Sequence, residues 1–371
     1  MQRTKPPFRA DEVGSLLRPQ RIKEARAKFE SGEISADELR KAEDMEIEKI
    51  VHRQASTGLR LATDGEFRRS WWHFDFLSKL TGCEMYDTAG IQFAGVQTRN
   101  QSVRVTGKLD FPDDHPMLSH FRFLNKQCDT AHVMAKMTIP SPAVLHFRGG
   151  RKSISKEVYP DLEVFFQDLG KTYRKAVKAF YDAGCRYLQF DDTVWAYLCS
   201  QEEHKKARER GDNLDGLQQV YARVINYAIA ERPADMTITT HVCRGNFRST
   251  WISSGGYEPV AETLLAGTNY DGYFLEYDSE RAGGFEPLRY LPKGNKVVVV
   301  GVITSKSGEL EKKDDIKRRL EEASKFAPLD QLALSPQCGF ASTEEGNILT
   351  EEEQWAKLRL AVEVAQEVWG K

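Results

Sequence analysis

The stretch that decides the fold is Lys296-Val297-Val298-Val299-Val300-Gly301-Val302-Ile303-Thr304. A short apolar run of β-branched residues is typical of a buried strand. A helical pattern follows at residues 312–323, and another strand pattern follows that helix at residues 331–336. A strand, a helix and a second strand in this order predict two parallel strands joined by a helix.

The same alternation continues along the rest of the chain. The sequence predicts strands at residues 8–15, 59–67, 132–142, 186–192, 236–243, 271–276, 296–304 and 331–336. It predicts helices at residues 19–32, 35–56, 161–182, 213–231, 256–265, 312–323 and 351–368. Eight strands, most of them followed by a helix, favour an α/β fold of the (β/α)8 TIM-barrel type, as a single domain over residues 1–371.

One segment departs from this alternation. Residues from about 80 to 112 alternate between apolar and polar side chains, which predicts a β-hairpin inserted after the second strand. An open, doubly wound sheet is the alternative to the barrel. No Gly-x-Gly-x-x-Gly motif follows any predicted strand, and this favours the barrel.

Composition and charge exclude several classes of protein. Of the 371 residues 40% are hydrophobic and 29% charged, which is sufficient for a large core. The net charge of -2 gives no basic field for nucleic acid. The six cysteines are too scattered for a disulfide framework, and no apolar segment resembles a signal peptide or a membrane span. We therefore expect a soluble, cytoplasmic protein that binds neither nucleic acid nor membranes.

Polar residues recur where the predicted strands end. They are Ser15, Asp64, Glu66, Thr138, Ser141, Asp191, His241, Cys243, Glu276 and Cys338. In a (β/α)8 barrel the carboxyl ends of all strands lie at one face, where the active sites of this fold are found. We therefore expect these residues to converge at one mouth of the barrel.

Four of these residues form a candidate metal site. His241 and Cys243 are two positions apart at one strand end, and Glu276 and Cys338 end later strands. Imidazole, thiolate and carboxylate ligands together suit Zn²⁺ better than Mg²⁺ or Ca²⁺. The alternative is a buried cysteine beside a hydrogen-bonded histidine in the core. The expected convergence of the strand ends favours the zinc site.

Six short motifs together resemble the catalytic half of cobalamin-independent methionine synthase, and especially its short, single-domain relatives. The motifs are Val13-Gly14-Ser15, Asp64-Gly65-Glu66-Phe67, Gln189-Phe190-Asp191-Asp192, Thr240-His241-Val242-Cys243, Leu275-Glu276 and Pro336-Gln337-Cys338-Gly339. The resemblance implies a barrel of the uroporphyrinogen-decarboxylase type. It also implies a zinc-dependent methyltransferase that converts homocysteine and a methyl donor to methionine, with the zinc ligands His241, Cys243, Glu276 and Cys338.

The resemblance assigns the amino-acid part of homocysteine to three positions. Ser15, Glu66 and Asp191 match the residues that hold it in the family. Glu66 and Asp191 are suited to pair with an α-ammonium group, and Ser15 with the carboxylate. A thiol bound to Zn²⁺ is deprotonated and becomes a nucleophile, so its position relative to the methyl group decides the rate.

Further residues are candidates for the same site. Thr138 and Ser141 at a strand exit, and Trp72 close to Glu66, are candidates for substrate binding. Trp72 either covers the donor or packs against the hairpin. Lys306 stands where the large synthases carry the histidine of an Asp-x-His motif that is linked to protonation of the leaving folate. We count Lys306 with Glu66 and Asp191 as candidate catalytic residues, and the lysine favours a donor other than methyltetrahydrofolate.

Three functions stay open at this point. The first is the homocysteine methyltransferase. The second keeps the zinc-bound thiolate but uses another electrophile or thiol, as in epoxyalkane:coenzyme M transferases. Glu66 and Asp191 favour an amino-acid thiol, because a sulfonate thiol calls for Arg or Lys. The third is a non-catalytic zinc-binding barrel. The sequence also leaves open the methyl donor and the oligomeric state, a homo-oligomer included.

Overall fold

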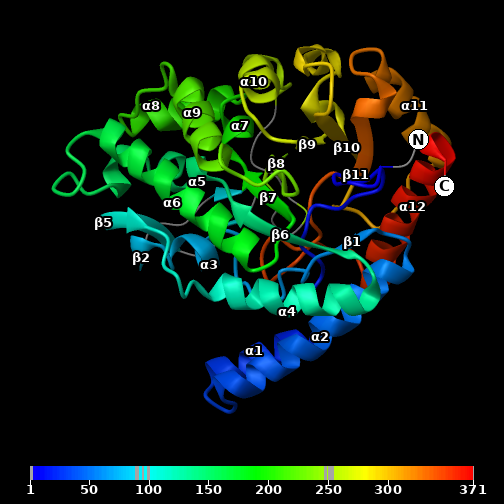
Figure 1. Ribbon diagram of the computed structural model, residues 1–371, viewed down its shortest axis with the longest axis horizontal. Coiled ribbons are helices and arrows are strands. Elements are labelled where there is room, and N and C mark those ends of the chain that lie inside the picture. Colours follow the sequence, from blue (N-terminus) through cyan, green and yellow to red (C-terminus); the bar gives the residue numbers. More distant parts are fainter. Residues whose placement is uncertain are drawn as a thin grey trace.

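A curled sheet of parallel strands forms the centre of the molecule. The computed structural model describes residues 3–87, 92–93, 96–97, 101–245, 249 and 255–370. Seven strands form the sheet in the order β1-β6-β7-β8-β9-β10-β11, and every neighbouring pair is parallel. Figure 1 shows the long helices on the outside of these strands. The strand order follows the chain, as repeated β-α units require.

The strands and helices have the following bounds. The sheet contains β1 (Leu61–Ala62), β6 (Met134–Pro140), β7 (Tyr187–Asp192), β8 (Thr237–Val242), β9 (Gly272–Glu276), β10 (Val297–Ile303) and β11 (Leu332–Pro336). The helices are α1 (Gln20–Glu30), α2 (Ala36–Ser56), α3 (Phe74–Leu77), α4 (Pro116–Ala131), α5 (Pro142–Phe147), α6 (Leu162–Asp182), α7 (Val194–Tyr197), α8 (Gln201–Glu209), α9 (Leu217–Ile229), α10 (Glu258–Ala261), α11 (Lys313–Ser324) and α12 (Glu351–Trp369). Short helical turns are η1 (Gly150–Ser153), η2 (Glu262–Ala266), η3 (Glu280–Ala282), η4 (Glu286–Tyr290) and η5 (Leu329–Gln331). Seven of the eight predicted strands are thereby confirmed.

Helix α4 was not predicted, although its pattern is present in the sequence. Its buried residues include Met117, Phe121, Leu124 and Cys128, at the spacing of one helix face. Pro116 occupies the first turn, where its missing N–H costs nothing. The helix covers β6 from the outside (Figure 1). Among the described residues no helix is long and apolar enough to cross a bilayer.

The first predicted strand, residues 8–15, is an extended segment with one strand contact. Ala10 forms a single parallel bridge with Leu334 of β11, and the Asp11 N–H donates to the Leu334 carbonyl at 3.0 Å. Toward the other edge of the sheet, the Leu16 N–H donates to the Gly65 carbonyl just beyond β1 at 3.1 Å. The segment therefore lies between the two edge strands, β11 and β1.

The side chain of Asp11 explains why no longer strand forms here. Its carboxylate accepts hydrogen bonds from the backbone N–H of Phe8 at 3.0 Å and of Glu12 at 2.9 Å. A side chain that binds neighbouring backbone groups offers them an alternative to a strand ladder. The prediction of a full strand at this place is corrected to one bridge.

The predicted hairpin is present between β1 and α4. Strands β2 (Thr81–Asp87) and β5 (Gln101–Asp110) pair antiparallel, and β3 (Gln92–Phe93) and β4 (Val96–Gln97) form a second small pair. Strand β5 buries Val103 and Val105 and packs against α6. Figure 1 shows β2 and β5 at the edge of the molecule, apart from the central sheet.

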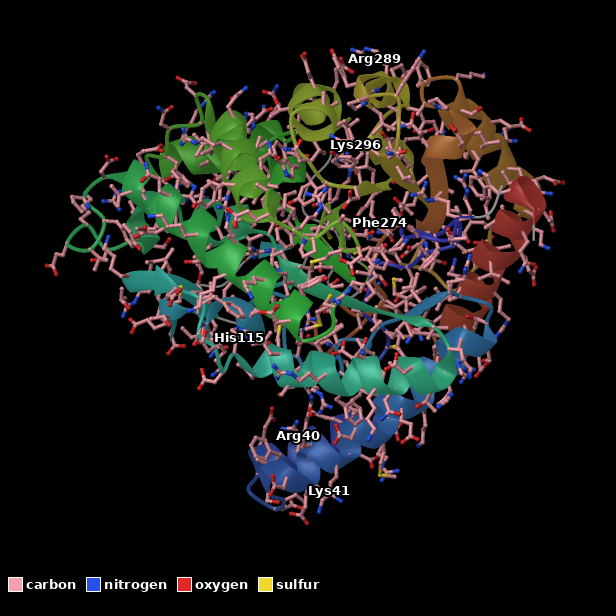
Figure 2. The ribbon with its side chains drawn as sticks, viewed as in Figure 1. Arg40, Lys41, His115, Phe274, Arg289 and Lys296 are labelled. Atoms are coloured by element: carbon pink, nitrogen blue, oxygen red, sulfur yellow. The ribbon has the colours of Figure 1, made fainter. Side chains whose placement is uncertain are left out.

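A buried ion pair joins the N-terminal segment to the sheet. Lys136 of β6 and Asp11 are fully buried, with 3.0 Å between Nζ and Oδ1. The ammonium also lies 4.1 Å from the ring centre of Phe274, and Figure 2 shows Phe274 among the central strands. The Tyr187 hydroxyl donates to the other oxygen of Asp11 at 2.9 Å. Both charges are thus compensated inside the protein, against the curled sheet.

We expect Lys136→Met to lower the free energy of unfolding by about 3–5 kcal/mol, because it leaves the Asp11 carboxylate buried without its counter-charge. Urea unfolding followed by tryptophan fluorescence measures the change. Lys175→Met is the control, since it breaks an exposed ion pair with Asp110. The control should lose less than about 1 kcal/mol. An equal effect of the two substitutions would contradict the prediction.

Candidate functional site

Four side chains with metal-binding atoms meet at the carboxyl edge of the sheet. His241 belongs to β8, and Cys243 is the first residue after that strand. Glu276 is the last residue of β9, and Cys338 lies two residues beyond the end of β11. One nitrogen, sulfur or oxygen atom from each lies within 4.8 Å of the others, and all four residues are buried. We call these four residues the ligand cluster. The structure therefore brings together the four residues that the sequence singled out as metal ligands.

The contacts within the ligand cluster fit a soft or borderline metal ion. The two sulfur atoms of Cys243 and Cys338 are 3.6 Å apart, and His241 Nε2 is 3.9 Å from Glu276 Oε1. Glu276 Oε1 accepts the Arg244 N–H at 3.1 Å, whereas its Oε2 is buried and has no hydrogen-bond partner in the described part of the chain. Two sulfurs, an imidazole and a carboxylate with a free lone pair are ligands typical of zinc.

The electrostatics of the cluster favour a thiolate. A hydrogen bond from Cys243, together with His241, holds the pKa of Cys338 well below that of an ordinary thiol, although burial opposes this. The same hydrogen bond and burial raise the pKa of Cys243. Burial raises the pKa of Glu276 to about 7, and the nearby positive charge of Lys306 limits the rise. A bound cation would stabilise all three anionic forms.

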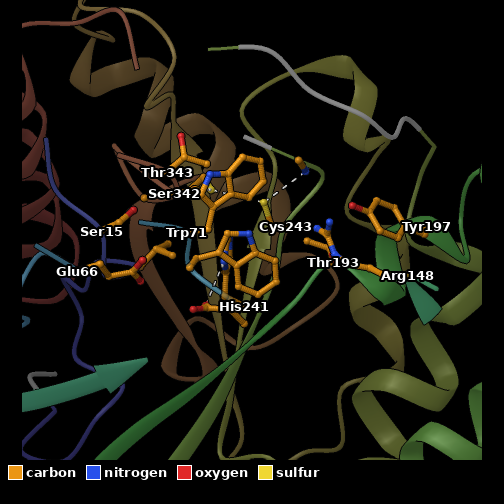
Figure 3. A pocket seen from close by; sticks show the side chains of 16 residues that line it. Ser15, Glu66, Trp71, Arg148, Thr193, Tyr197, His241, Cys243, Ser342 and Thr343 are labelled. Carbon is orange, nitrogen blue, oxygen red and sulfur yellow. Dashed lines mark hydrogen bonds and ion pairs between the residues drawn. The ribbon is translucent and has the colours of Figure 1, made fainter. Parts of the chain in front are cut away.

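A pocket of about 540 Å³, which includes its part open to solvent, lies against the ligand cluster. Figure 3 shows Ser15 and Glu66 on one side of Cys243, and Arg148 and Tyr197 on the other. We call Ser15, Glu66 and the neighbouring Asp191 the carboxylate end. We call Arg148, Tyr197 and the neighbouring Thr193 the arginine end. All six of these residues line the pocket.

Glu66 is held in an unusual backbone conformation at the carboxylate end. Its φ angle is 59°, in the left-handed region that costs a residue with a side chain about 1 kcal/mol. The Thr138 hydroxyl donates to its Oε1 at 2.9 Å, and the Arg69 guanidinium is 3.4 Å from the same atom. Oε2 is buried without a hydrogen-bond partner among the described residues. The carboxylate is thus fixed with one oxygen available to a ligand.

Burial raises the pKa of Glu66 to about 7, although the positive charge of Arg69 opposes the rise. The negative charge of Asp191 adds to the rise. A carboxylate with these neighbours gains from a cationic ligand, because the ligand compensates both negative charges.

Asp191 links the carboxylate end to the ligand cluster. Its Oδ1 accepts a hydrogen bond from Gln189 at 2.7 Å and lies 3.5 Å from His241 Nδ1. A carboxylate that binds the second nitrogen of a metal-binding histidine fixes the orientation of the ring. The sequence predicted Asp191 as a substrate-binding residue, and the structure adds this contact with His241.

Ser15 reaches the pocket because of a glycine opposite it. Its Oγ accepts the Ala341 N–H at 3.3 Å. A Cβ atom at Gly339 would lie 2.0 Å from that Oγ, so any side chain there would displace the serine. Gly339 therefore belongs to the positioning of Ser15.

The other predicted site residues divide into two groups. Trp72 lines the pocket, and the guanidinium of Arg148 lies 5.7 Å from its ring centre. Thr138 and Ser141 do not line it: Thr138 donates to Glu66, and Ser141 donates to Asp192 at 2.6 Å. In this structure each of the two hydroxyls supports a carboxylate, and their contact with a substrate stays a prediction.

Lys306 lies beside the ligand cluster and outside the pocket lining. Its Nζ is buried and has no hydrogen-bond partner in the described residues. Its positive charge lowers the pKa values of Glu276, Cys243 and Cys338, as a minor contribution for each thiol.

Sequence reasoning missed the arginine end. Arg148 is the residue after α5, and Thr193 and Tyr197 belong to the turn and short helix after β7. None of the three carries a motif of its own. Their position in the sequence could have indicated them, because all three come shortly after predicted strands that end in polar residues.

A curled parallel sheet with a His/Cys/Glu/Cys cluster at the carboxyl ends of its strands defines an α/β protein with a candidate thiolate metal site. Residues 8–367 match the family described as cobalamin-independent synthase, catalytic domain. The chain belongs to this family of methionine synthase-like methyltransferases.

Individual proteins are similar to this chain over most or all of its length. The uncharacterized protein YxjG of Bacillus subtilis is 55% identical over 371 residues, which cover 100% of this chain and 97% of YxjG. A crystal structure from Listeria monocytogenes, of a protein assigned to the vitamin-B12 independent methionine synthases, has a TM-score of 0.81 and 48% identity and covers 100% of both chains. A B12-independent methionine synthase from Shewanella sp. W3-18-1, in complex with selenomethionine, has a TM-score of 0.67 at 19% identity over 96% of both chains. The Shewanella protein shares the fold.

Proposed function

We propose that the protein is a zinc-dependent methyltransferase that makes methionine from homocysteine. The observation that carries the proposal is the ligand cluster, which has four metal-binding atoms within 4.8 Å at the side of a pocket that also contains two carboxylates. We further propose that the N-terminal segment closes the sheet into a (β/α)8 barrel as one domain. In that fold the carboxyl ends of the strands form the active site.

The residues of the ligand cluster fit Zn²⁺, and His241, Cys243, Glu276 and Cys338 would hold it. Bound there, the ion would lower the pKa of a thiol that coordinates it and so supply a nucleophilic sulfur at neutral pH. Two thiolates and a carboxylate among the ligands would keep that sulfur rich in electrons.

The carboxylate end is suited to the amino-acid part of homocysteine. Glu66 and Asp191 offer negative oxygens to the ammonium group, and the free Oε2 of Glu66 is an acceptor without a protein donor in the described residues. Ser15 offers its hydroxyl to the carboxylate group. Held at these three side chains, the substrate would direct its sulfur toward the cluster beside them (Figure 3).

The reaction transfers one methyl group without oxidation or reduction. The sulfur uses a lone pair to form the new bond to the methyl carbon, and the bond between that carbon and the donor breaks with its electron pair left on the donor. The thiol proton leaves to solvent. Attack in line with the breaking bond requires both substrates to be positioned, which the protein accomplishes through binding. Lys306 would supply positive charge close to the leaving group.

We expect homocysteine to add a sulfur ligand to the metal. X-ray absorption at the zinc edge of the purified protein should show two sulfur neighbours at about 2.3 Å before homocysteine is added and three afterwards. Homoserine, which has a hydroxyl in place of the thiol of homocysteine, is the control and should add no sulfur ligand. No change at saturating homocysteine would contradict the proposal and favour a non-catalytic zinc site.

Lys306 favours a second candidate function that keeps the same nucleophile. An unpaired buried ammonium beside the cluster also suits an electrophile that leaves an oxygen anion, such as an epoxide. In that case the product is a hydroxyalkyl thioether. Mass spectrometry of the product formed from homocysteine with methyl donors or with epoxypropane separates the two candidates.

A further inference from the structure

The arginine end of the pocket carries a positive charge that no carboxylate in the described part of the chain compensates. Arg148 is the only Arg or Lys among the described residues that line the pocket. No described carboxylate forms an ion pair with it, and its Nε is buried without a hydrogen-bond partner. Arg148 is half-buried, so its terminal N–H groups can reach a ligand in the pocket. Guanidinium groups bind carboxylates and phosphates through several N–H groups at once.

Two other arginines close to the pocket, Arg69 and Arg18, bind carbonyl or carboxylate groups of the protein and serve for comparison. Arg69 donates to the Thr138 carbonyl at 2.7 Å and pairs with Glu66 at 3.4 Å. Arg18 donates to the carbonyls of Glu66 at 2.9 Å and Thr343 at 3.1 Å. Arg148 makes no contact of this kind with the described residues.

The backbone that carries Arg148 is nevertheless firmly anchored. His146, two residues earlier, contacts the Tyr221 hydroxyl at 2.6 Å, and the Phe147 carbonyl accepts a hydrogen bond from Arg210 at 3.0 Å. The Phe147 ring stacks on Tyr197 with 5.8 Å between the ring centres. The arginine is therefore presented to the pocket by a fixed turn, with the Trp72 ring beside its guanidinium.

We propose that Arg148 binds an anionic group of the methyl donor. This inference rests on the proposed function, because it concerns the second substrate of that reaction. The two ends of the pocket differ in charge: the carboxylate end suits the ammonium of homocysteine, and the arginine end suits an anion. Figure 3 shows the two ends on opposite sides of Cys243, so the two substrates can approach the sulfur position from different directions.

The chemistry at the arginine end defines the class of donor. A planar guanidinium with parallel N–H groups matches a carboxylate, a phosphate or a sulfonate. The hydroxyls of Thr193 and Tyr197 at the same end can donate further hydrogen bonds, and Trp72 provides a flat apolar surface. The donor is thus a molecule with an anionic oxygen group at one end and the methyl group at the other.

The test measures binding, with zinc and homocysteine present, in the wild type and in Arg148→Ala and Arg148→Lys. The probes are 5-methyltetrahydrofolate with one glutamate, S-methylmethionine and dimethylsulfoniopropionate, which carry carboxylates. The methyl ester of dimethylsulfoniopropionate and trimethylsulfonium lack the anion. Competition by acetate, methylphosphonate and methanesulfonate at constant ionic strength then identifies the preferred anion.

We expect Arg148→Ala to weaken binding of at least one anionic probe by about 10- to 100-fold, as the loss of a charge-assisted hydrogen bond predicts. Arg148→Lys should restore part of the affinity, and the probes without an anion should bind all variants equally. Arg223→Ala, which removes an exposed arginine on α9 that pairs with Glu163, is the control.

Two results would overturn the inference: equal binding of every anionic probe to the wild type and Arg148→Ala, or no binding of any of them to the wild type. Homocysteine affinity is measured separately and should not change in Arg148→Ala. If homocysteine fails to bind the wild type, the proposed function fails, whatever Arg148 does.

Discussion

Cys338→Ser and Cys243→Ser are each expected to abolish metal binding. Each substitution removes one of the two sulfur ligands and replaces it with a hydroxyl, which stays protonated and is a poor ligand for zinc. Loss of a residue that merely supports a ligand already costs about 10- to 100-fold in metal affinity, so the loss of a ligand should cost more. Atomic emission spectrometry of the purified proteins should find about one zinc per chain in the wild type and close to none in either variant.

The control for these variants is Cys185→Ser. Cys185 is also a buried free cysteine, but its thiol donates to the Tyr187 carbonyl and lies outside the ligand cluster. The control should keep its zinc, and circular dichroism should show that all three variants fold. Full zinc content in both Cys338→Ser and Cys243→Ser would disprove the ligand assignment. Loss of zinc in the control as well would show that the measurement reports misfolding.

Glu66→Gln and Asp191→Asn are expected to weaken binding of methionine, the proposed product, by about 10- to 100-fold each. Each substitution keeps the shape of the side chain and removes a charge-assisted hydrogen bond to the ammonium group, which is worth about 1.5–3 kcal/mol. Isothermal titration calorimetry with methionine measures the effect without interference from an ionising thiol. Zinc content should not change in Glu66→Gln, because Glu66 lies outside the ligand cluster. Asp191→Asn keeps an amide oxygen that can accept from His241 Nδ1, so we expect it to keep zinc when it is purified with zinc in excess.

The affinity of the wild type for methionine should also depend on pH. Because the pKa of Glu66 is raised to about 7, the carboxylate becomes protonated as the pH falls through that value, and the attraction for the ammonium group is lost. Affinity should therefore decrease from about pH 8 to about pH 6, and the decrease should be smaller in Glu66→Gln.

Glu258→Gln is the control for both carboxylate variants, since Glu258 pairs with Arg289 on the exposed surface. It should bind methionine like the wild type. If Asp191→Asn binds methionine normally but loses zinc, the role of Asp191 is to orient His241 and not to bind the substrate. If both carboxylate variants bind methionine like the control, the carboxylate end does not hold the amino-acid group.

The central strands and the ligand cluster could be predicted because their signals are local. The run of four valines from Val297 to Val300 forms part of β10, where all seven residues are buried. His241, Glu276 and Cys338 follow or end such runs, and parallel strands place their carboxyl ends at one edge. Once the strands are correct, the approximate position of each ligand follows from the chain itself.

Prediction from the sequence was less accurate where a side chain binds backbone N–H groups that a strand would otherwise use. Residues 8–15 contain a strand pattern, but the Asp11 carboxylate binds two N–H groups of that segment, and Lys136, from a distant part of the chain, fixes the carboxylate there. The sequence also did not reveal the partners of the Thr138 and Ser141 hydroxyls. Both lie near the end of β6, yet each donates to a carboxylate next to the pocket, and this depends on rotamers that the sequence does not reveal.

The sequence by itself determined the order of the strands and the identity of the candidate metal ligands. Only the tertiary structure decided how the pocket is divided. Arg148 acquires its significance from what surrounds it: Trp72 and Tyr197 come from other parts of the chain, and no carboxylate in the described residues approaches the arginine. Whether a charge is compensated depends on every neighbour within a few ångströms, and the packing of distant segments determines those neighbours. The pattern that predicts a strand, in contrast, lies in consecutive residues.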